Sequence, residues 1–242
     1  MVEPQTARSR RCFVWRLGMR EYGGVLDLQR RLARARMAGQ VPDLLLLVEH
    51  PPVITCGRGA RPEHLLVGPD ELRRRRVGLF QVERGGDVTY HGPGQLVGYP
   101  ILDLHGYGLD VHLHLRRIER ALIGTLAAAG LSAGVSPGRT GVWVHERKIA
   151  SIGVHVSRWV TWHGFALNVC TDLRDFDAIV PCGLPGVQIT SLAMELGREV
   201  NVAAVEPALV AAFGEVFGAA MTSWGPDEAA QFAPVAASIA PS

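Results

Sequence analysis

The feature that most restricts the fold is the segment Leu44–His50, which opens with an unbroken aliphatic run from Leu44 to Val48. Such a run lacks the alternation of a strand with one wet face and is typical of a strand that is buried on both faces. The following Pro51-Pro52 pair ends the segment. The run is also far shorter than the ~20 residues that a membrane-spanning helix needs. We therefore expect a sheet with both faces covered.

The remaining elements follow from periodicity and from end signals. Apolar residues recur at helical spacing through 22–38, which predicts an amphipathic helix. Asp110 is suited to cap a second helix that closes at Gly130. Further helices are expected at 73–76 (capped by Asp70 and ended by Gly78), 191–196 and 203–217, and strands at 12–17, 53–55, 80–83, 96–102, 141–145, 148–156 and 161–169. This mixture predicts an α/β (α+β) fold with mixed β-sheets flanked by helices.

The domain organisation is expected to be simple. Residues 1–221 show no repeat and no linker between two cores, so they predict a single domain. Residues 171–190 carry no periodic pattern and are expected to be irregular. Residues 222–242 are rich in Ala, Pro and Ser and predict a loosely ordered tail.

Composition excludes several classes of protein. The chain has 242 residues, 48% hydrophobic and 20% charged, which argues against collagen-like, coiled-coil and disordered chains. The net charge of +2 gives no strong field toward nucleic acid or a membrane. The four cysteines lack metal-ligand spacing, and the N-terminus lacks the pattern of a secretory signal. We expect a cytoplasmic protein with reduced thiols.

The use of basic residues is unusual. Of the 25 basic residues, 24 are Arg and Lys148 is the single Lys. An ammonium is compact and can be tuned by burial, whereas a guanidinium stays protonated. Lys148 therefore either performs a task that Arg cannot, or survives by chance on the surface.

A glycine-rich segment runs from Arg84 to Gln95 and contains four glycines and one proline. Glycines let a backbone approach a ligand closely, although they also suit a tight hairpin turn. The segment matches neither the P-loop nor the dinucleotide-binding fingerprint. Because Arg84, Thr89, Tyr90 and His91 supply more hydrogen-bonding groups than a turn requires, we favour a functional segment.

Cys182 is the favoured nucleophile, because it lies between Pro181 and Gly183 in the irregular stretch, where a thiol has no strand or helix face to fill. Cys12 and Cys170 lie in apolar strands and are expected to be inert core residues. Cys56, before Gly-Arg-Gly, is a weaker rival. A reactive Cys needs a nearby cation or His, and Lys148 is the natural candidate.

The nine histidines and the arginine clusters carry weaker signals. His112 and His114 are two apart on a helix and face different directions, so no metal site is predicted. The clusters at 30–36 and 73–76 are either solvated helix faces or docking sites for an acidic partner. No G-x-S-x-G elbow supports a serine hydrolase.

Several segments together resemble the lipoyl(octanoyl) transferase family of lipoate assembly. They are Arg84-Gly-Gly-Asp-Val-Thr-Tyr-His-Gly-Pro-Gly-Gln-Leu-Val-Gly-Tyr-Pro, Arg147-Lys-Ile-Ala-Ser-Ile-Gly-Val, Gly164-Phe-Ala-Leu-Asn-Val, Ile179-Val-Pro-Cys-Gly-Leu and Thr190-Ser-Leu. They occur in the family's order, and the resemblance covers residues 12 to 217. It implies a biotin/lipoate-protein-ligase-like fold.

The resemblance also implies an activity and a site. The family moves an octanoyl group from octanoyl-acyl carrier protein to a lysine on lipoyl domains of 2-oxoacid dehydrogenase E2 subunits and on the glycine cleavage H protein. By resemblance, Cys182 carries the acyl thioester and Lys148 favours its thiolate. The implied substrate-binding residues are Arg84, Gly85, Gly86, Asp87, Val88, Thr89, Tyr90, His91, Ser151, Ile152, Gly153, Gly164, Phe165 and Ala166. No cofactor, metal, nucleic acid or membrane is implied, and a monomer is expected.

Three further points stay open at this level. Backbone N–H groups near Gly183 or in the glycine-rich segment are expected to bind the oxyanion, and Lys148 or His91 to take the acceptor's proton. An ATP-dependent lipoate ligase of the same fold is the alternative enzyme. A module that binds acylated carrier protein without being acylated is the non-enzymatic alternative.

Overall fold

The computed structural model describes residues 10–232 and residue 235. The strands are β1 (Arg10–Met19), β2 (Asp43–Glu49), β3 (Val53–Cys56), β4 (Gly78–Gln81), β5 (Val88–His91), β6 (Gln95–Ile101), β7 (Gly134–Ser136), β8 (Arg139–Val144), β9 (Arg147–Ser157), β10 (Val160–Asn168) and β11 (Ala219–Ser223). The α-helices are α1 (Tyr22–Met37), α2 (Pro69–Arg75), α3 (Val111–Ala128), α4 (Leu192–Leu196), α5 (Val202–Phe217) and α6 (Pro226–Gln231).

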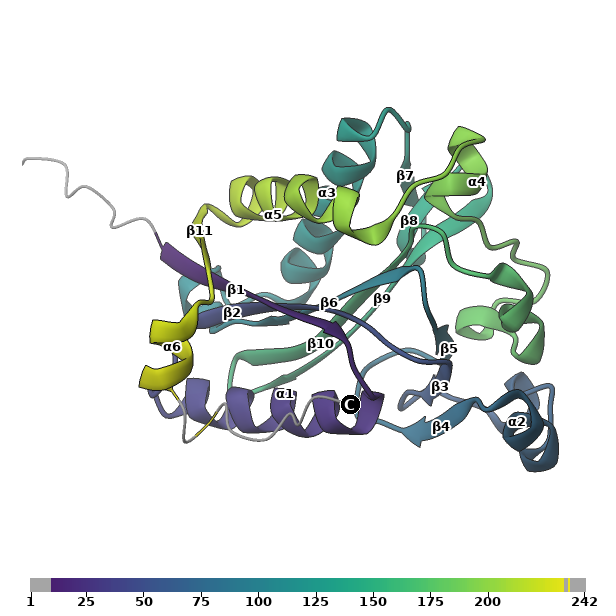
Figure 1. Cartoon of the computed structure of the whole chain (residues 1–242), viewed down its shortest axis with the longest axis horizontal. Coiled ribbons are helices and arrows are strands. Elements are labelled where there is room, and N and C mark those ends of the chain that lie inside the picture. The colour runs from purple at the N-terminus through teal and green to yellow at the C-terminus, as the bar shows by residue number, and fades with distance from the viewer. Residues whose placement is uncertain (1–9, 233–234, 236–242) are drawn as a thin grey trace, which may run out of the picture.

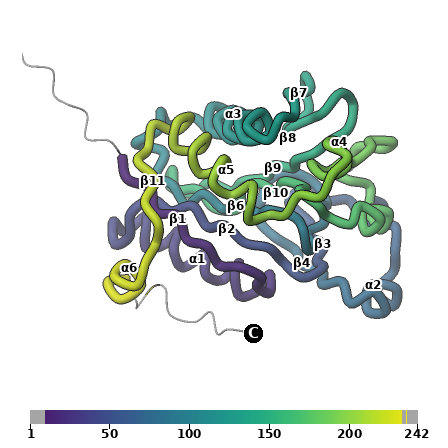
Figure 2. The backbone as a smooth tube through the Cα atoms, turned by 45° about the horizontal axis from the view of Figure 1, so that its top comes forward, coloured from purple at the N-terminus to yellow at the C-terminus, as the bar shows by residue number. Residues whose placement is uncertain are grey.

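The strands form two sheets. An eight-stranded sheet has the order β11-β1-β2-β6-β10-β9-β8-β7, and a three-stranded sheet has the order β4-β3-β5. Helix α1 covers one face of the large sheet, and α3 and α5 cover the other (Figure 1). The small sheet and α2 lie at the end of the molecule opposite β11 and α6 (Figure 2). No described helix is long and apolar enough to cross a membrane.

Strand β2 confirms the expectation drawn from its aliphatic run. Leu45 and Leu47 belong to the core under α3 and α5, while Leu44 and Leu46 belong to the core under α1. All four side chains are at most 1% exposed. Because successive side chains of a strand point to opposite faces, an uninterrupted aliphatic run supplies both cores at once.

The helix ends agree with the sequence signals at α3 but not at α2. The Asp110 side chain accepts a hydrogen bond from the Leu113 N–H, so the predicted cap is confirmed. The cap expected at Asp70 is wrong, because α2 begins at Pro69 after Gly68 and no side chain caps it. Proline suits the first helical position, where its missing N–H costs nothing. Helix α2 also ends earlier than expected, at the left-handed residue Arg76.

The C-terminal segment carries more regular structure than expected. Strand β11 pairs in parallel with β1, placing Val14 beside Ser223, and α6 follows it. The Trp224 ring stacks on Trp15 with centroids 4.9 Å apart. The loose order expected from residue 222 is therefore wrong for 222–231, while 233–234 and 236–242 lie outside the described residues. The domain boundary at 221 stays a prediction.

Candidate active site

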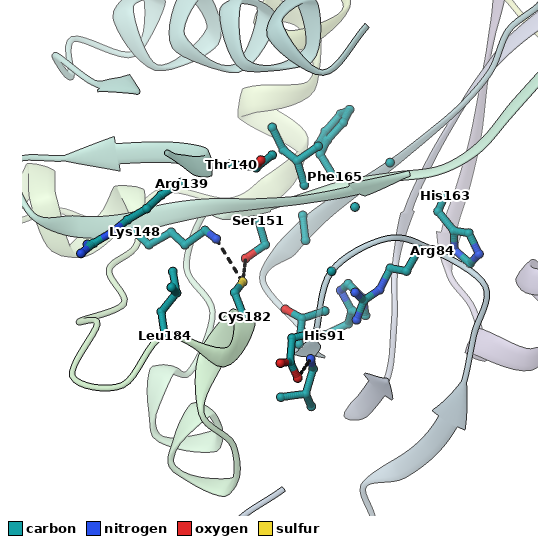
Figure 3. Close-up of a pocket in the computed structure, with 18 of the residues that line it drawn as sticks. Arg84, His91, Arg139, Thr140, Lys148, Ser151, His163, Phe165, Cys182 and Leu184 are labelled. Atoms are coloured by element: carbon teal, nitrogen blue, oxygen red, sulfur yellow. Dashed lines mark hydrogen bonds between the residues drawn. The ribbon is translucent and has the colours of Figure 1, made fainter. Parts of the chain in front are cut away.

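One pocket of about 240 Å³ brings together most of the residues singled out from the sequence (Figure 3). Its walls come from the glycine-rich segment, from β6, β9 and β10 of the large sheet, from the start of β8 with the turn before it, from the start of α1, and from the loop that carries Cys182. The lining residues are Tyr22, Arg84, Gly86, Asp87, Val88, Thr89, His91, Tyr99, Gly138, Arg139, Thr140, Lys148, Ser151, Ile152, Gly153, His163, Gly164, Phe165, Ala166, Cys182 and Leu184.

Cys182 lies in a single tight turn between Pro181 and Gly183. Its backbone has φ 54°, in the left-handed region that non-glycine residues seldom adopt. The turn is closed by hydrogen bonds from the Gly183 N–H to the Val180 carbonyl and from the Leu184 N–H to the Pro181 carbonyl. The expectation that N–H groups near Gly183 bind an oxyanion is thus not supported at Gly183 and Leu184, because both donors are engaged.

The irregular stretch that carries Cys182 is fixed on both sides. Before the turn, the Leu66 N–H donates to the Ala178 carbonyl and the Val180 N–H donates to the His64 carbonyl. After it, segment 188–190 brackets Lys148: the Lys148 N–H donates to the Gln188 carbonyl at 2.8 Å, and the Thr190 N–H donates to the Lys148 carbonyl at 2.9 Å. Backbone bonds to distant segments therefore set the position of the loop that carries Cys182.

Lys148 and Cys182 are in direct contact. The Lys148 Nζ donates a hydrogen bond to the Cys182 Sγ at 3.0 Å (Figure 3). Lys148 is only 2% exposed, whereas Cys182 is half-buried and reachable from the pocket. The Ser151 Oγ lies 3.7 Å from the same sulfur. An ammonium at this distance stabilises a thiolate and so makes the sulfur a better nucleophile.

Arg84 places a second cation beside the pocket. Its guanidinium is 8% exposed and donates from Nη2 to the Thr55 carbonyl at 2.6 Å and to the Thr55 Oγ1 at 2.9 Å. Burial lowers the pKa of Arg84, and the thiol of Cys182 is among the groups that raise it in return. Arg84 therefore adds positive potential at Cys182 without displacing Lys148.

The glycine-rich segment is held against β9 at very short range. The Gly85 N–H donates to the Val154 carbonyl at 2.9 Å. A Cβ at Gly153 would stand 2.9 Å from the Gly85 carbonyl oxygen and 3.1 Å from the Arg84 Cδ. Gly153 is therefore needed for the close approach of two backbones.

His91 is held neutral at the base of the pocket. Burial lowers its pKa to about 3, with the neighbouring His50 as a smaller cause. Its Nδ1 lies 2.7 Å from the Gln95 Oε1, while the Gln95 amide donates to the Asn168 Oδ1 at 2.9 Å. Because the Gln95 oxygen can only accept, Nδ1 carries the proton and Nε2 is left as an acceptor.

Two of the sixteen predicted site residues do not line the pocket. The Gly85 backbone is used to bind β9, as described above. Tyr90 points to the other side of the small sheet, where its hydroxyl donates to Asp175 Oδ2 at 2.6 Å and its ring packs on Phe176. Neighbours on a strand alternate in direction, so Tyr90 points away from the side of β5 on which Thr89 and His91 line the pocket. The roles assigned to all sixteen stay predictions.

Sequence reasoning missed seven lining residues, which come from five parts of the chain: Tyr22, Tyr99, Gly138, Arg139, Thr140, His163 and Leu184. Tyr99 belongs to a family-like stretch, so a signal for it was present. Tyr22 reaches the pocket from the start of α1, where its ring stacks on His91 with centroids 6.0 Å apart. Nothing in the local sequence around Tyr22 or Arg139 indicates that long-range placement.

The other three cysteines are poorer nucleophiles. Cys12 is fully buried, and burial raises the pKa of its thiol. Burial likewise raises the pKa of Cys56. The expectation that Cys170 is a core residue is wrong: it follows the end of β10 and is exposed. Its thiol pKa is raised by partial desolvation and by Glu49.

The histidine pair and the arginine clusters singled out from the sequence lie outside the pocket. His112 is exposed and His114 is buried, which confirms that they face different directions. No group of three His, Cys, Asp or Glu side chains suited to a metal ion occurs among residues 10–232. Both arginine clusters form ion pairs with carboxylates of other residues, including Arg30 with Glu83 and Arg75 with Glu71. Docking at either cluster stays a prediction.

Comparison with known proteins places the chain in a family. The lipoyl protein ligase A/B catalytic domain model matches residues 21–214. An octanoyltransferase of Solibacter usitatus is 52% identical over 86% of this chain and 94% of its own length. An octanoyltransferase of Gloeobacter violaceus is 49% identical over 86% of this chain and 91% of its own.

Solved structures show the same fold at low identity. A lipoate-protein ligase A bound with ATP has a TM-score of 0.71 at 17% identity, covering 94% of each chain. A bi-partite lipoate protein ligase from Thermoplasma acidophilum has a TM-score of 0.67 at 19% identity, covering 93% of this chain and 92% of its own. These confirm the predicted ligase-like fold. With its catalytic-domain match over most of its length, the chain belongs to the lipoyl protein ligase A/B family.

Proposed function

We propose that this protein transfers an octanoyl group from octanoyl-acyl carrier protein to a lysine of a lipoyl domain, through a thioester on Cys182. Curated octanoyltransferases at about half identity support octanoyl transfer. The observation that carries the covalent route is the 3.0 Å contact between the Lys148 Nζ and the Cys182 Sγ in a pocket.

In the first half-reaction the Cys182 thiolate attacks the carbonyl carbon of the donor thioester. The C–S bond to the carrier breaks, and the carrier thiolate takes a proton from the Lys148 ammonium. The products are the octanoyl thioester of Cys182, the free carrier thiol and a neutral Lys148. Arg84 lowers the cost of the negative charge that develops next to Cys182.

In the second half-reaction the neutral amine of the acceptor lysine attacks the Cys182 thioester. A C–N bond forms, the C–S bond to Cys182 breaks, and the amine loses one proton. Lys148 is the better acceptor of that proton, because burial holds the pKa of His91 at about 3 and makes its free nitrogen a weak base. The step restores the Lys148 ammonium and the Cys182 thiolate.

The pocket lining combines apolar side chains that suit an acyl chain with polar groups that suit the chemistry. Ile152, Phe165 and Leu184 are among its apolar lining residues, and the Lys148–Cys182 pair lies next to them (Figure 3). Burying a methylene stabilises a complex by about 0.8 kcal/mol, so an eight-carbon chain gains roughly 5 kcal/mol. The acceptors are lipoyl domains of 2-oxoacid dehydrogenase E2 subunits and the glycine cleavage H protein.

An ATP-dependent lipoate ligase is the second candidate, because ligases share the fold. A ligase activates the free acid and needs no cysteine nucleophile. The ligase mechanism therefore does not explain the contact between Lys148 and Cys182. Transfer from octanoyl-acyl carrier protein in the absence of ATP excludes the ligase. A pure binding module would hold the acylated carrier without ever being acylated.

Intact-protein mass spectrometry tests the proposal after mixing with octanoyl-acyl carrier protein. We expect a hydroxylamine-labile octanoyl adduct on the wild type and on Cys170→Ala, a control at an exposed cysteine outside the pocket. Cys182→Ala should carry none, and an added lipoyl domain should discharge the adduct. Transfer by Cys182→Ala at the wild-type rate would contradict the covalent route.

A further inference from the structure

The Lys148 ammonium is buried without a carboxylate. Its Nζ donates to the Cys182 Sγ, and no acidic side chain in the described part of the chain lies within ion-pair distance. Placing an ammonium in a protein interior is costly unless other groups compensate the lost hydration. Apart from the Cys182 sulfur, no negatively charged group in the described part of the chain pairs with the Lys148 ammonium, so a neutral group must supply the rest of the compensation.

The ring of Trp143 is the group in the right place. Trp143 and Lys148 are register partners in the β8–β9 hairpin, so their side chains lie on the same face. The Lys148 Nζ lies over the indole ring, 5.5 Å from its centroid. Trp143 is 3% exposed, so little water separates or screens the two groups.

The indole N–H does not explain why a tryptophan stands here. The Trp143 Nε1 is buried and has no hydrogen-bond partner among the described residues, although buried tryptophans usually find one. A smaller apolar ring would avoid that penalty. Among Trp, Tyr and Phe, tryptophan has the ring face with the most negative electrostatic potential. Here the Lys148 cation lies over that face.

We propose that Trp143 is a positioning residue that holds the Lys148 ammonium, through its ring face, at hydrogen-bonding distance from Cys182. The inference rests on the proposed roles of Lys148 and Cys182. A carboxylate in the same place would bind the ammonium more strongly, but it would also repel the thiolate and compete with it for the proton. The ring attracts the cation and carries no net charge, so it leaves the thiolate as the best anionic partner.

Other charged groups surround the pair without replacing this contact. Arg139 on β8 lies 5.6 Å from the same ring centroid and competes for it. Glu119 of α3 accepts the Gly141 N–H and pairs with Arg116. On the Cys182 side lie the buried Arg84 and the hydrogen-bonded His64–Asp87 pair, which packs against Gly183.

Site-specific fluorination of the Trp143 ring tests the proposal. Fluorine withdraws electrons from the ring face and changes the shape of the side chain little, so the protein should fold normally. We expect the rate of Cys182 carbamidomethylation at neutral pH to fall stepwise with each added fluorine. In Trp143→Leu the rate should fall roughly 2- to 30-fold, which is the loss of one cation–π interaction expressed as a rate ratio. The midpoint of the alkylation pH profile should rise in parallel.

The controls separate this inference from the proposed function. Fluorination at Trp159, a half-exposed tryptophan outside the pocket lining, should leave alkylation unchanged. Lys148→Met should slow alkylation strongly; if it does not, the proposed role of Lys148 fails. If Lys148→Met slows alkylation but the fluorinated series at Trp143 is flat, the Trp143 inference alone is overturned.

Discussion

His114 offers a quantitative test of how burial acts in this fold. The residue lies on α3, is 1% exposed, and packs edge-on against Phe217 with centroids 5.7 Å apart. Neither ring nitrogen has a hydrogen-bond partner among the described residues. Burial lowers the pKa of His114 from 6.5 to about 4, with the Arg117 cation as a smaller cause. Folding therefore requires the neutral ring.

The sign of the pH effect follows from that lowered pKa. The unfolded chain takes up a proton at His114 as the pH falls through 6.5, while the folded chain resists until about pH 4. The contribution of His114 to the free energy of unfolding is thus full above pH 6.5 and falls by about 1.4 kcal/mol per pH unit between pH 6.5 and about pH 4. At pH 5 the loss from this one residue is about 2 kcal/mol.

The variant His114→Leu should remove this loss. At pH 7 it deletes two unpaired buried nitrogens, each of which costs roughly 1–3 kcal/mol, and so should be at least as stable as the wild type. Between pH 7 and pH 5 its urea-unfolding free energy should fall by about 2 kcal/mol less than that of the wild type. The matched control is His112→Leu, an exposed position on the same helix.

Parallel pH curves for the wild type and His114→Leu would refute the reasoning. They would mean that the folded protein accepts a proton at His114 at no cost, as an exposed residue does. A pH curve of His112→Leu that departs further from the wild-type curve than that of His114→Leu does would lead to the same conclusion.

Three further predictions concern the site. Tyr90→Phe should cost roughly 1.5–3 kcal/mol in urea unfolding, because it loses a hydrogen bond to the Asp175 carboxylate. It should keep kcat, because Tyr90 faces away from the pocket; a large drop in kcat would show that it acts in the reaction. Gly153→Ala should keep the circular dichroism spectrum but lose most acyl transfer, because its Cβ would push against Gly85. Peptide mapping after iodoacetamide should find Cys182 labelled first, exposed Cys170 next and buried Cys12 last; labelling of Cys170 ahead of Cys182 would argue against an activating Lys148.

The parts of the fold that could be predicted are those with local causes. The burial of β2 on both faces can be predicted from the aliphatic run of that one strand. The Asp110 cap can be predicted because its partner, Leu113, lies only three residues away. Where two local signals compete, the prediction at α2 is wrong, because Pro69 takes the first helical position ahead of Asp70. Strand β11 is missed because its partner β1 lies some two hundred residues earlier.

The candidate site divides in the same way. Lys148 and Cys182 stand out by rarity and by context, and the resemblance supplies their relationship. Their 3.0 Å contact, however, depends on backbone bonds between Lys148 and segment 188–190, which no periodicity encodes. Tyr90 shows the reverse case, in which a residue inside a family-like segment faces away from the pocket because strands alternate.

The near-absence of lysine has a chemical consequence for a protein that carries an activated acyl group. A thioester reacts with amines, and exposed lysines would be targets for self-modification. Here the 24 arginines stay protonated and do not compete at neutral pH. The single side-chain amine is 2% exposed and lies beside Cys182. On the proposed mechanism, the surface of this protein therefore lacks the nucleophile that the reaction acylates, and any misdirected octanoyl group on a lysine would be found at Lys148.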